Sequence, residues 1–100
     1  MISDAGFIEL ANEVISKIAD KTEEMDTDCN FDIDLNNSIL SISGSVGTYV
    51  INVQSAANEI WLSSPISGPF HFGYINGQWV SSRGDNLFDI LNKELKISIS

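Results

Sequence analysis

The sequence predicts an α+β protein, a two-layer α/β sandwich with two terminal helices packed on one face of a five- to six-stranded antiparallel sheet. Three observations predict this fold class. Apolar residues recur with helical spacing near both ends of the chain, and every second residue is apolar in the segments between them. Short turns rich in asparagine, glycine and serine separate these central segments, which favours antiparallel hairpins. Each terminal helix has one apolar side, so both helices need a common surface to cover.

The first helix is predicted to begin at a cap provided by Ser3 or Asp4 and to end at about Met25. The apolar side of this helix consists of Phe7, Leu10, Ala11, Val14, Ile15, Ile18 and Met25. The polar stretch 26–28 ends the helical pattern, and a period of two begins at Phe31. A strand is therefore expected directly after the helix.

Six central segments have the alternation that is typical of strands. They are residues 31–35, 39–43, 48–54, 59–63, 70–74 and 78–81. Asn36-Asn37 and Asn76-Gly77 are predicted as tight turns, because asparagine and glycine tolerate the positive φ of two-residue hairpin loops.

A second helix is predicted at the end of the chain. Its apolar residues Leu87, Ile90, Leu91 and Leu95 have helical spacing. Asn86, with an aspartate three residues later, resembles a capping box, and Gly84 precedes it as a hinge.

Composition limits the class of protein. One hundred residues, of which 43% are apolar and 19% charged, suit a single globular domain spanning residues 1–100. Neither a membrane span nor the pattern of a secretory signal is expected from the sequence. One cysteine and one histidine exclude a Cys- or His-rich zinc site within one chain. Because the net charge is −9, neither nucleic acid nor an anionic membrane is an expected partner.

The acidic residues are concentrated at one end of the chain. Ten of the 14 carboxylates fall in the first 34 residues, where only Lys17 and Lys21 oppose them. On the first helix, five of them share one arc of about 100° opposite the apolar side: Glu9, Glu13, Asp20, Glu23 and Glu24. A helix that docks on a core needs a polar outer face, but not one that is nearly all negative. The excess of negative charge on this helix therefore predicts that a cation or a basic partner binds there.

Three runs of residues resemble the frataxin family: 47–54 (GTYVINVQ), 60–65 (IWLSSP) and 67–69 (SGP). Trp79 and the closing helix also fit, and the resemblance extends from Phe7 to Leu95 in the order and spacing of the family. The compact length and the lack of a presequence resemble the bacterial branch, called CyaY, so a bacterial cytoplasmic protein is expected. An organellar protein with its presequence removed would have the same features.

The resemblance implies a role in iron-sulfur cluster assembly, with iron bound weakly by an acidic ridge. Carried over residue by residue, the implied metal ligands are Glu13, Asp20, Glu23, Glu24, Asp26, Asp28 and Asp32. Carboxylates alone suit Mg²⁺, Ca²⁺, Mn²⁺ and iron, so the preference for iron rests on the resemblance. The ridge is also implied to meet basic residues of the cysteine desulfurase.

The uncovered face of the sheet is implied to contact the iron-sulfur scaffold protein through Asn52, Gln54 and Trp61. Trp61 lies between two apolar residues that are expected to face the helices, so alternation places it on the opposite face. An exposed tryptophan on an open sheet is a candidate binding anchor. The alternative is a tryptophan that loops partly cover for stability.

Other interpretations of the acidic residues stay open. The simplest is a solvated polar face. Two further functions compete with an iron-binding accessory protein: a ferroxidase, because clustered carboxylates stabilise Fe³⁺ more than Fe²⁺, and an acidic protein-interaction module in which metal binding is incidental. Neither a serine-histidine-acid spacing nor a phosphate-binding glycine loop supports a covalent or nucleotide-dependent enzyme.

Four further residues have individual expectations. Val53 stands where relatives usually have a basic residue, and Gly73 stands where many have an acidic one. Alternation predicts that Val53 faces the helices. His71 is expected to be packed or solvent-facing rather than a metal ligand. Cys29, next to an aspartate, is not expected to be a reactive thiolate.

Overall fold

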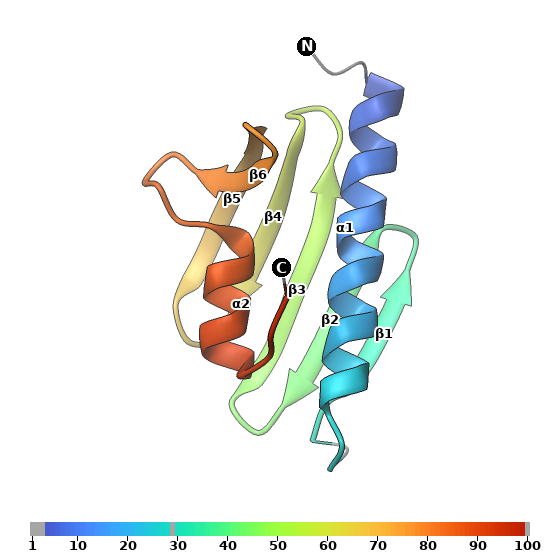
Figure 1. The fold of residues 1–100 in the computed structure, drawn as a ribbon, viewed down its shortest axis with the longest axis vertical. Helices are drawn as coiled ribbons and strands as arrows, with labels where there is room; N and C mark the ends of the chain where they lie inside the picture. The colour runs from blue at the N-terminus through green and yellow to red at the C-terminus, as the bar shows by residue number, and fades with distance from the viewer. Residues whose placement is uncertain (1–3, 29, 100) are drawn as a thin grey trace.

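The chain folds into a helix, six strands and a second helix (Figure 1). Residues 4–28 and 30–99 are described by the structure, which is a computed structural model. The helices are α1 (Asp4–Met25) and α2 (Leu87–Leu95). The strands are β1 (Asp32–Asn36), β2 (Ile39–Gly44), β3 (Gly47–Gln54), β4 (Glu59–Ser64), β5 (Gly68–Ile75) and β6 (Gln78–Ser81). Every predicted helix and strand is confirmed, with ends that move by at most about two residues, as is usual at element boundaries.

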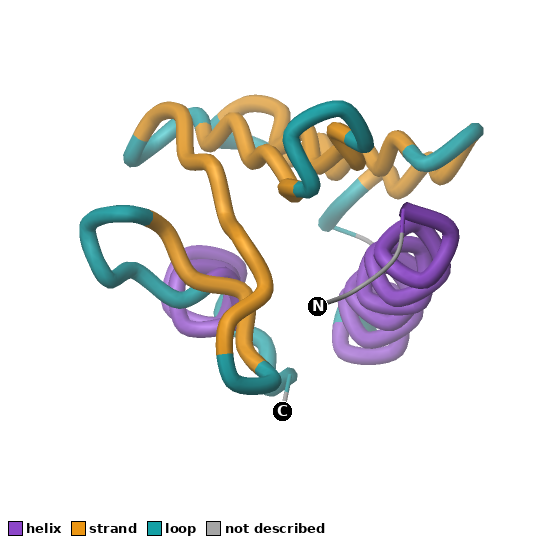
Figure 2. Tube along the Cα trace, turned by 90° about the horizontal axis from the view of Figure 1, so that it is seen from above, coloured by secondary structure: helices purple, strands orange, loops and turns teal. Residues whose placement is uncertain are grey.

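The six strands form one antiparallel sheet, and their order in space is their order in the chain. Both helices lie on the same face of this sheet, which is seen end-on in Figure 2. Helix α1 contacts β1, β2 and β3, whereas α2 contacts β6, towards which the sheet curls (Figures 1 and 2). The predicted two-layer sandwich is therefore confirmed, and the other face of the sheet is left without a helix.

One continuous core fills the space between the two layers. Alternate residues of the strands point into it, and every third or fourth residue of α1 meets them. Helix α2 contributes Leu87 and Leu91. Eleven core residues of α1 and the strands are at most 2% exposed: Phe7, Ala11, Ile15, Ile18, Leu40, Ile42, Tyr49, Ile51, Ile60, Leu62 and Phe72.

The first hairpin turn lies one residue later than predicted. Asn36 pairs with Ile39, so the loop consists of Asn37 and Ser38, which both have positive φ (50° and 65°). The Ser38 hydroxyl donates a hydrogen bond of 2.6 Å to the side-chain oxygen of Asn12 on α1. This tertiary contact favours the left-handed conformation at a serine, which local propensity does not. The Asn76-Gly77 turn is confirmed, with φ of 50° and 79°.

The chain after α2 turns back and lies between the two helices (Figure 1). Lys96 adopts the left-handed conformation that ends α2, and Ile97 and Ile99 are then buried. The Asn92 side chain accepts a hydrogen bond from the Ile99 amide at 2.8 Å and donates one to its carbonyl at 3.0 Å. The tail therefore closes the gap between the helices and extends the core. Helical spacing cannot reveal this contact, but the alternation of isoleucine and serine after Lys96 could have.

Candidate metal- and partner-binding surfaces

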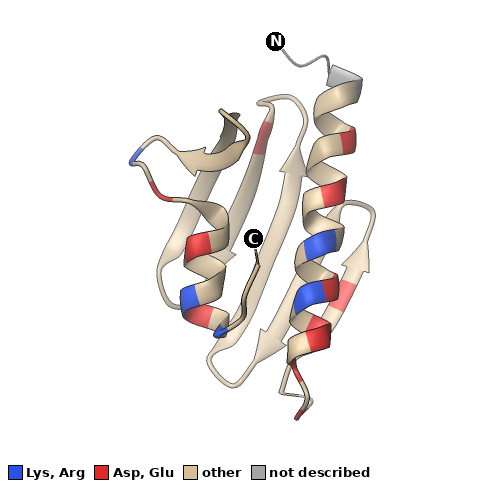
Figure 3. Cartoon of the chain, in the orientation of Figure 1, with Lys and Arg blue, Asp and Glu red and all other residues tan. Residues whose placement is uncertain are grey.

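Acidic residues lie along α1 and on the neighbouring strand β1 (Figure 3). The predicted apolar side of α1 faces the core, except for Met25, which is 46% exposed because the helix ends there. The carboxylates of α1 are left on the outer side. Beyond the helix, Asp28 is exposed in the turn, and Asp32 is exposed on β1, the edge strand of the sheet. The predicted ligands thus follow one edge of the sandwich. We call this set the acidic ridge: Glu9, Glu13, Asp20, Glu23, Glu24, Asp26, Asp28 and Asp32.

The acidic ridge has more negative charge than its own lysines can neutralise. Eight carboxylates face only Lys17 and Lys21 in this part of the chain. Lys21 Nζ lies 3.8 Å from Glu24 Oε2, and the two side chains are 40% and 69% exposed, so this ion pair is weak. Glu23 is in the last turn of α1, which contains no basic residue. A carboxylate there lies at the negative end of the helix dipole, which is an unfavourable position.

Asp26 has a structural contact that the sequence did not reveal. Its two carboxylate oxygens accept hydrogen bonds from the backbone amides of Asn30 (2.7 Å) and Phe31 (2.8 Å). These bonds fix the connection between α1 and β1, and the ring of Phe31 then packs over Gly44, where a Cβ would lie 2.8 Å from the ring. Asp26 is half-buried, whereas the other predicted metal ligands are exposed. Of these ligands, it is the one with a clear structural role.

The acidic ridge is an open row of carboxylates and not a cage. Within residues 4–28 and 30–99, no three His, Cys, Asp or Glu side chains are grouped closely enough to hold a metal ion. A cation on the ridge would therefore be held by few side chains and would keep most of its water. Cys29, which was expected to be unreactive, lies outside the described residues.

The uncovered face of the sheet presents Trp61, as predicted. Ile60 and Leu62 are buried on the helix side, and Trp61 is half-buried on the opposite side. Asn52 of β3 and His71 of β5 lie directly opposite Trp61 on the two neighbouring strands. The three side chains therefore form one row across β3, β4 and β5.

Trp61 is partly covered by residues of its own strand and of the neighbouring strand. Its ring stacks on the imidazole of His71, with centroids 4.2 Å apart and planes at 11°. Its indole Nε1 donates to Glu59 Oε1 at 2.9 Å. The predicted partner residues Asn52 and Gln54 are joined by a hydrogen bond of 3.1 Å from the Gln54 amide. The row is thus ordered by its own contacts before any partner arrives.

The remaining expectations for this sheet are met. His71 is solvent-exposed and packed by stacking. Val53 packs against the core on the helix side. Gly73 of β5 lies directly opposite Glu59 of β4. Because glycine has no side chain, Glu59 is the one carboxylate of this strand pair.

A second polar cluster, which has no signature in the sequence, joins α2 to the sheet. The carboxylate of Glu94 accepts hydrogen bonds from Tyr49 Oη (3.1 Å), Ser64 Oγ (2.6 Å) and Ser67 Oγ (2.5 Å). Burial raises the pKa of Glu94, but these donors outweigh it and lower the pKa below its ordinary value. Burial, and then the Glu94 carboxylate, raise the pKa of Tyr49 to about 12.

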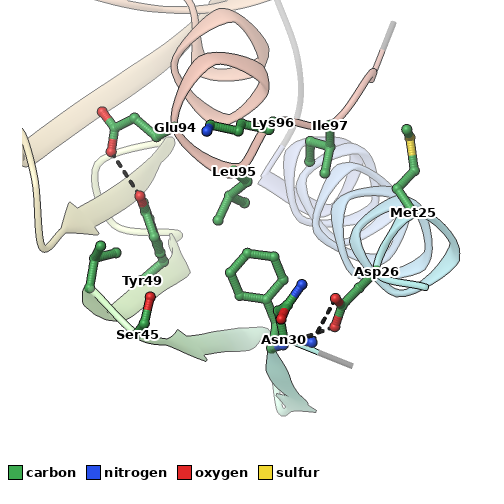
Figure 4. Close-up of a pocket in the computed structure, with 11 residues that line it drawn as sticks. Met25, Asp26, Asn30, Ser45, Tyr49, Glu94, Leu95, Lys96 and Ile97 are labelled. Carbon is green, nitrogen blue, oxygen red and sulfur yellow. Dashed lines mark hydrogen bonds between the residues drawn. The ribbon is translucent and has the colours of Figure 1, made fainter. Parts of the chain in front are cut away.

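Tyr49 and Glu94 line one side of a cavity of about 470 Å³ (Figure 4). Asp26 and Met25 line its other side, below the end of α1. Because Glu94 already accepts three hydrogen bonds, we assign it a structural role. The residues of this cluster lie on β3, β4, α2 and the turn after β4, so no local sequence motif predicts the cluster.

The fold and its surfaces define a class of small α/β sandwich that presents carboxylates along one edge and a tryptophan on an open sheet. A family model described as "Frataxin-like domain" matches residues 1–100, and the chain belongs to the frataxin family. The resemblance inferred from the sequence is thus confirmed. None of the helices in the described residues is long and apolar enough to cross a membrane.

Known relatives come from several lineages. The chain is 40% identical over 97 residues to the mitochondrial frataxin homolog of Saccharomyces cerevisiae, which covers 92% of this chain and 56% of the relative. It is 35% identical to mitochondrial frataxin of Arabidopsis thaliana, over 96% of this chain and 55% of the relative. The chain therefore spans about half the length of the curated relatives that it matches.

Solved frataxin structures have the same fold. Frataxin from Psychromonas ingrahamii, of the CyaY protein family, matches with a TM-score of 0.79 and 30% identity over 100% of this chain and 97% of that one. Trimeric yeast frataxin, in a crystal structure complexed with ferrous iron, matches with a TM-score of 0.79 and 40% identity, over 86% of this chain and 81% of that one.

Proposed function

We propose that this chain is an iron-binding accessory protein of iron-sulfur cluster assembly. It presents weakly bound iron on the acidic ridge and modulates the complex of cysteine desulfurase and scaffold protein. The observation that carries this proposal is the charge excess on one edge, where eight carboxylates face two lysines. The yeast structure with ferrous iron supports iron as the cation. The proposed ligands are Glu13, Asp20, Glu23, Glu24, Asp26, Asp28 and Asp32.

The open geometry of the acidic ridge suits transfer of iron better than storage. Exposed carboxylates that bind one face of a hydrated cation give weak affinity and fast exchange. A neighbouring protein can then replace the remaining water ligands with its own side chains. Relief of the like-charge repulsion along α1 adds to the binding free energy.

Two surfaces are proposed for the protein partners. The acidic ridge would meet basic residues of the cysteine desulfurase. Asn52, Gln54 and Trp61 on the uncovered face, with His71 beside them, would meet the scaffold protein. Tryptophan is enriched among residues that dominate interface energetics, and a preordered stack loses little entropy on binding. The two surfaces lie on different parts of the molecule, so both partners can be bound together.

An acidic interaction module is the second candidate. The observation that favours it is that no three metal-ligating side chains are grouped in the described residues. On this hypothesis the ridge recognises basic protein surfaces, and iron binds there only because the carboxylates are present.

We also propose that residues 1–100 form one domain, because a single core includes both helices and all the central strands. The proposed location is the bacterial cytoplasm. A mitochondrial location is the alternative, and the mitochondrial relatives favour it.

Charge reversal tests the acidic ridge as a desulfurase contact, which both candidates require. In the variant with Glu23→Lys and Glu24→Lys, desulfurase binding in metal-free buffer with a chelator is expected to be lost if the ridge is an interaction surface. Asp89→Lys, an exposed carboxylate on α2, is the matched control. Binding that survives the double reversal would contradict the ridge as a desulfurase contact.

Iron binding is tested separately by titrating the apo protein with Fe²⁺ under anaerobic conditions and following the backbone amide signals by NMR. We expect the changes to concentrate at residues 13–32 and to be absent from the double reversal at 23 and 24. Changes spread evenly over the chain would contradict an iron site on the acidic ridge.

A further inference from the structure

A small cavity lies at the opposite edge of the sheet from the acidic ridge, where β6 ends. It encloses about 210 Å³ and is lined by Pro69, Phe70, His71, Ser81, Ser82 and Arg83. This lining contains one arginine, one histidine and no carboxylate. The other cavities described in this structure each include at least one carboxylate. A cavity lined by an arginine and no carboxylate is unusual in a chain with a net charge of −9.

The cavity exists because β6 is shorter than β5. Pairing between them stops at Phe72 and Ser81, where the chain turns sharply. Ser81 holds this turn: its hydroxyl oxygen accepts the amides of Arg83 (3.2 Å) and Asp85 (3.1 Å), and its carbonyl accepts the amide of Gly84 (3.0 Å). The first half of β5 therefore has β4 as its only strand neighbour in the described part of the chain.

The open part of β5 directs a backbone donor and acceptor into the cavity. In a two-residue hairpin the closing pair is hydrogen-bonded, and every second residue then bonds to the same neighbour. Ile75 closes the hairpin with Gln78, so Gly73 and then His71 point their backbone groups to the β6 side. His71 has no partner on β6, because the pairing of β5 with β6 ends at Phe72. An extended peptide could pair with the backbone there.

Arg83 projects from the turn beside this open edge. Its guanidinium carbon lies 5.2 Å from the centroid of the Phe70 ring, and the side chain is 67% exposed. Its ion pair with Asp85 spans 3.8 Å from Nε to Oδ2, which is longer than a hydrogen bond. Asp85 instead accepts a hydrogen bond of 3.1 Å from the Ser81 hydroxyl. The donors of the guanidinium are therefore available to another carboxylate.

We propose that this cavity, together with the adjoining stack of Trp61 and His71, docks an acidic extended segment of a protein partner. A carboxylate of the segment pairs with Arg83, its backbone bonds to His71, and an adjacent apolar side chain covers the stack. Charge complementarity favours this occupant, because the lining of this cavity has a cation and no carboxylate, unlike the linings of the other cavities described. The inference deepens the proposed scaffold contact and rests on it for the identity of the partner.

Binding to the purified scaffold protein is the first test. We expect Arg83→Gln to weaken the affinity about tenfold, the loss typical of one charge-assisted hydrogen-bonded pair, and Trp61→Ala to weaken it at least as much. Lys93→Gln, an exposed cation on α2, is the matched control and should leave the affinity unchanged. If Trp61→Ala weakens binding and Arg83→Gln does not, this inference is overturned and the scaffold contact stands.

A peptide titration tests the docking chemistry without the scaffold. The probe is acetyl-Val-Glu-Val-Glu-Val-amide, and its counterpart with glutamine in place of glutamate is the control. The acidic peptide is expected to shift the amide signals of His71, Ser82 and Arg83 in a saturable way that Arg83→Gln abolishes. Equal shifts with both peptides, or no shifts at these residues, would overturn the inference even if the full protein binds the scaffold.

Discussion

Replacing Glu23 with glutamine is expected to stabilise the fold and to weaken cation binding at the same time. Glu23 has Asp20 three residues before it, and such a like-charge pair costs about 0.2–0.5 kcal/mol. It also lies in a last helical turn without a basic residue, where a negative charge costs about 0.3–1 kcal/mol. Glutamate and glutamine have similar helix propensity. The free energy of unfolding should therefore rise by about 0.5–1.5 kcal/mol, the sum of these two terms.

The assay is thermal unfolding followed by circular dichroism at low ionic strength. For a chain of this size, 1 kcal/mol shifts Tm by about 4–8 °C, so an increase of at least ~2 °C is expected. Asp89→Asn is the control, because Asp89 lies in the first turn of α2, where its charge is favourable. Neutralising Asp89 should lower Tm. Moderate salt should raise the Tm of the unmodified protein and reduce its difference from Glu23→Gln.

The cation dependence of the same melt completes the test. A cation present at ten times its dissociation constant stabilises the folded state by about 1.4 kcal/mol. Millimolar Fe²⁺ or Mn²⁺ should therefore raise the Tm of the unmodified protein clearly, and raise that of Glu23→Gln less. If Glu23→Gln lowers Tm, the negative charge of Glu23 does not destabilise the fold. If cations stabilise both proteins equally, Glu23 does not contribute to cation binding.

Three further outcomes concern the contacts that hold the surfaces in place. Asp26→Ala removes the acceptor for two backbone amides, so we expect a loss of about 1.5–3 kcal/mol in urea unfolding, with Asp26→Asn losing less. Because the pKa of Glu94 is lowered in the folded state, its stabilisation is present above the ordinary value of 4.5 and is lost as pH falls. Unfolding of Glu94→Gln should accordingly depend less on pH below 4.5; an unchanged dependence would show that the three hydroxyl donors do not favour the charged form. Ile99→Ala leaves a cavity between the helices and should cost about 2–4 kcal/mol, whereas Ser98→Ala, at an exposed position, should cost little.

The strands and the core could be predicted because their signals are local. Alternation fixed which side of β4 faces the helices, and that alone placed Trp61 correctly. The loop at Asn37 and Ser38 was predicted one residue early because a hydrogen bond to Asn12, 26 positions before Ser38, decides its conformation. Contacts of this kind have no signature in a window of neighbouring residues.

The same distinction applies to the surfaces. The acidic ridge is visible in the sequence because helical spacing puts its members on one side. The stack of Trp61 on His71 could not be predicted without the register between β4 and β5. The cluster around Glu94 depends on how α2 packs against β3, β4 and the turn after β4. Asp26 was predicted as a metal ligand from its charge, but its additional role became visible only with the backbone amides that it accepts.

The two ends of the sheet differ in charge, because the acidic ridge is strongly negative whereas Arg83 at the other end is balanced by Asp85. This difference bears on the proposed function. The acidic ridge follows β1, and Arg83 lies beside the end of β6, with four strands between these edges. The molecule measures 41 × 26 × 21 Å, whereas the screening length at physiological ionic strength is about 8 Å. Each edge therefore acts on its partner almost independently of the other. A basic protein surface is attracted to one edge, and an acidic segment to the other. A protein built this way can hold two partners of opposite charge together, which is what modulation of a two-component assembly requires.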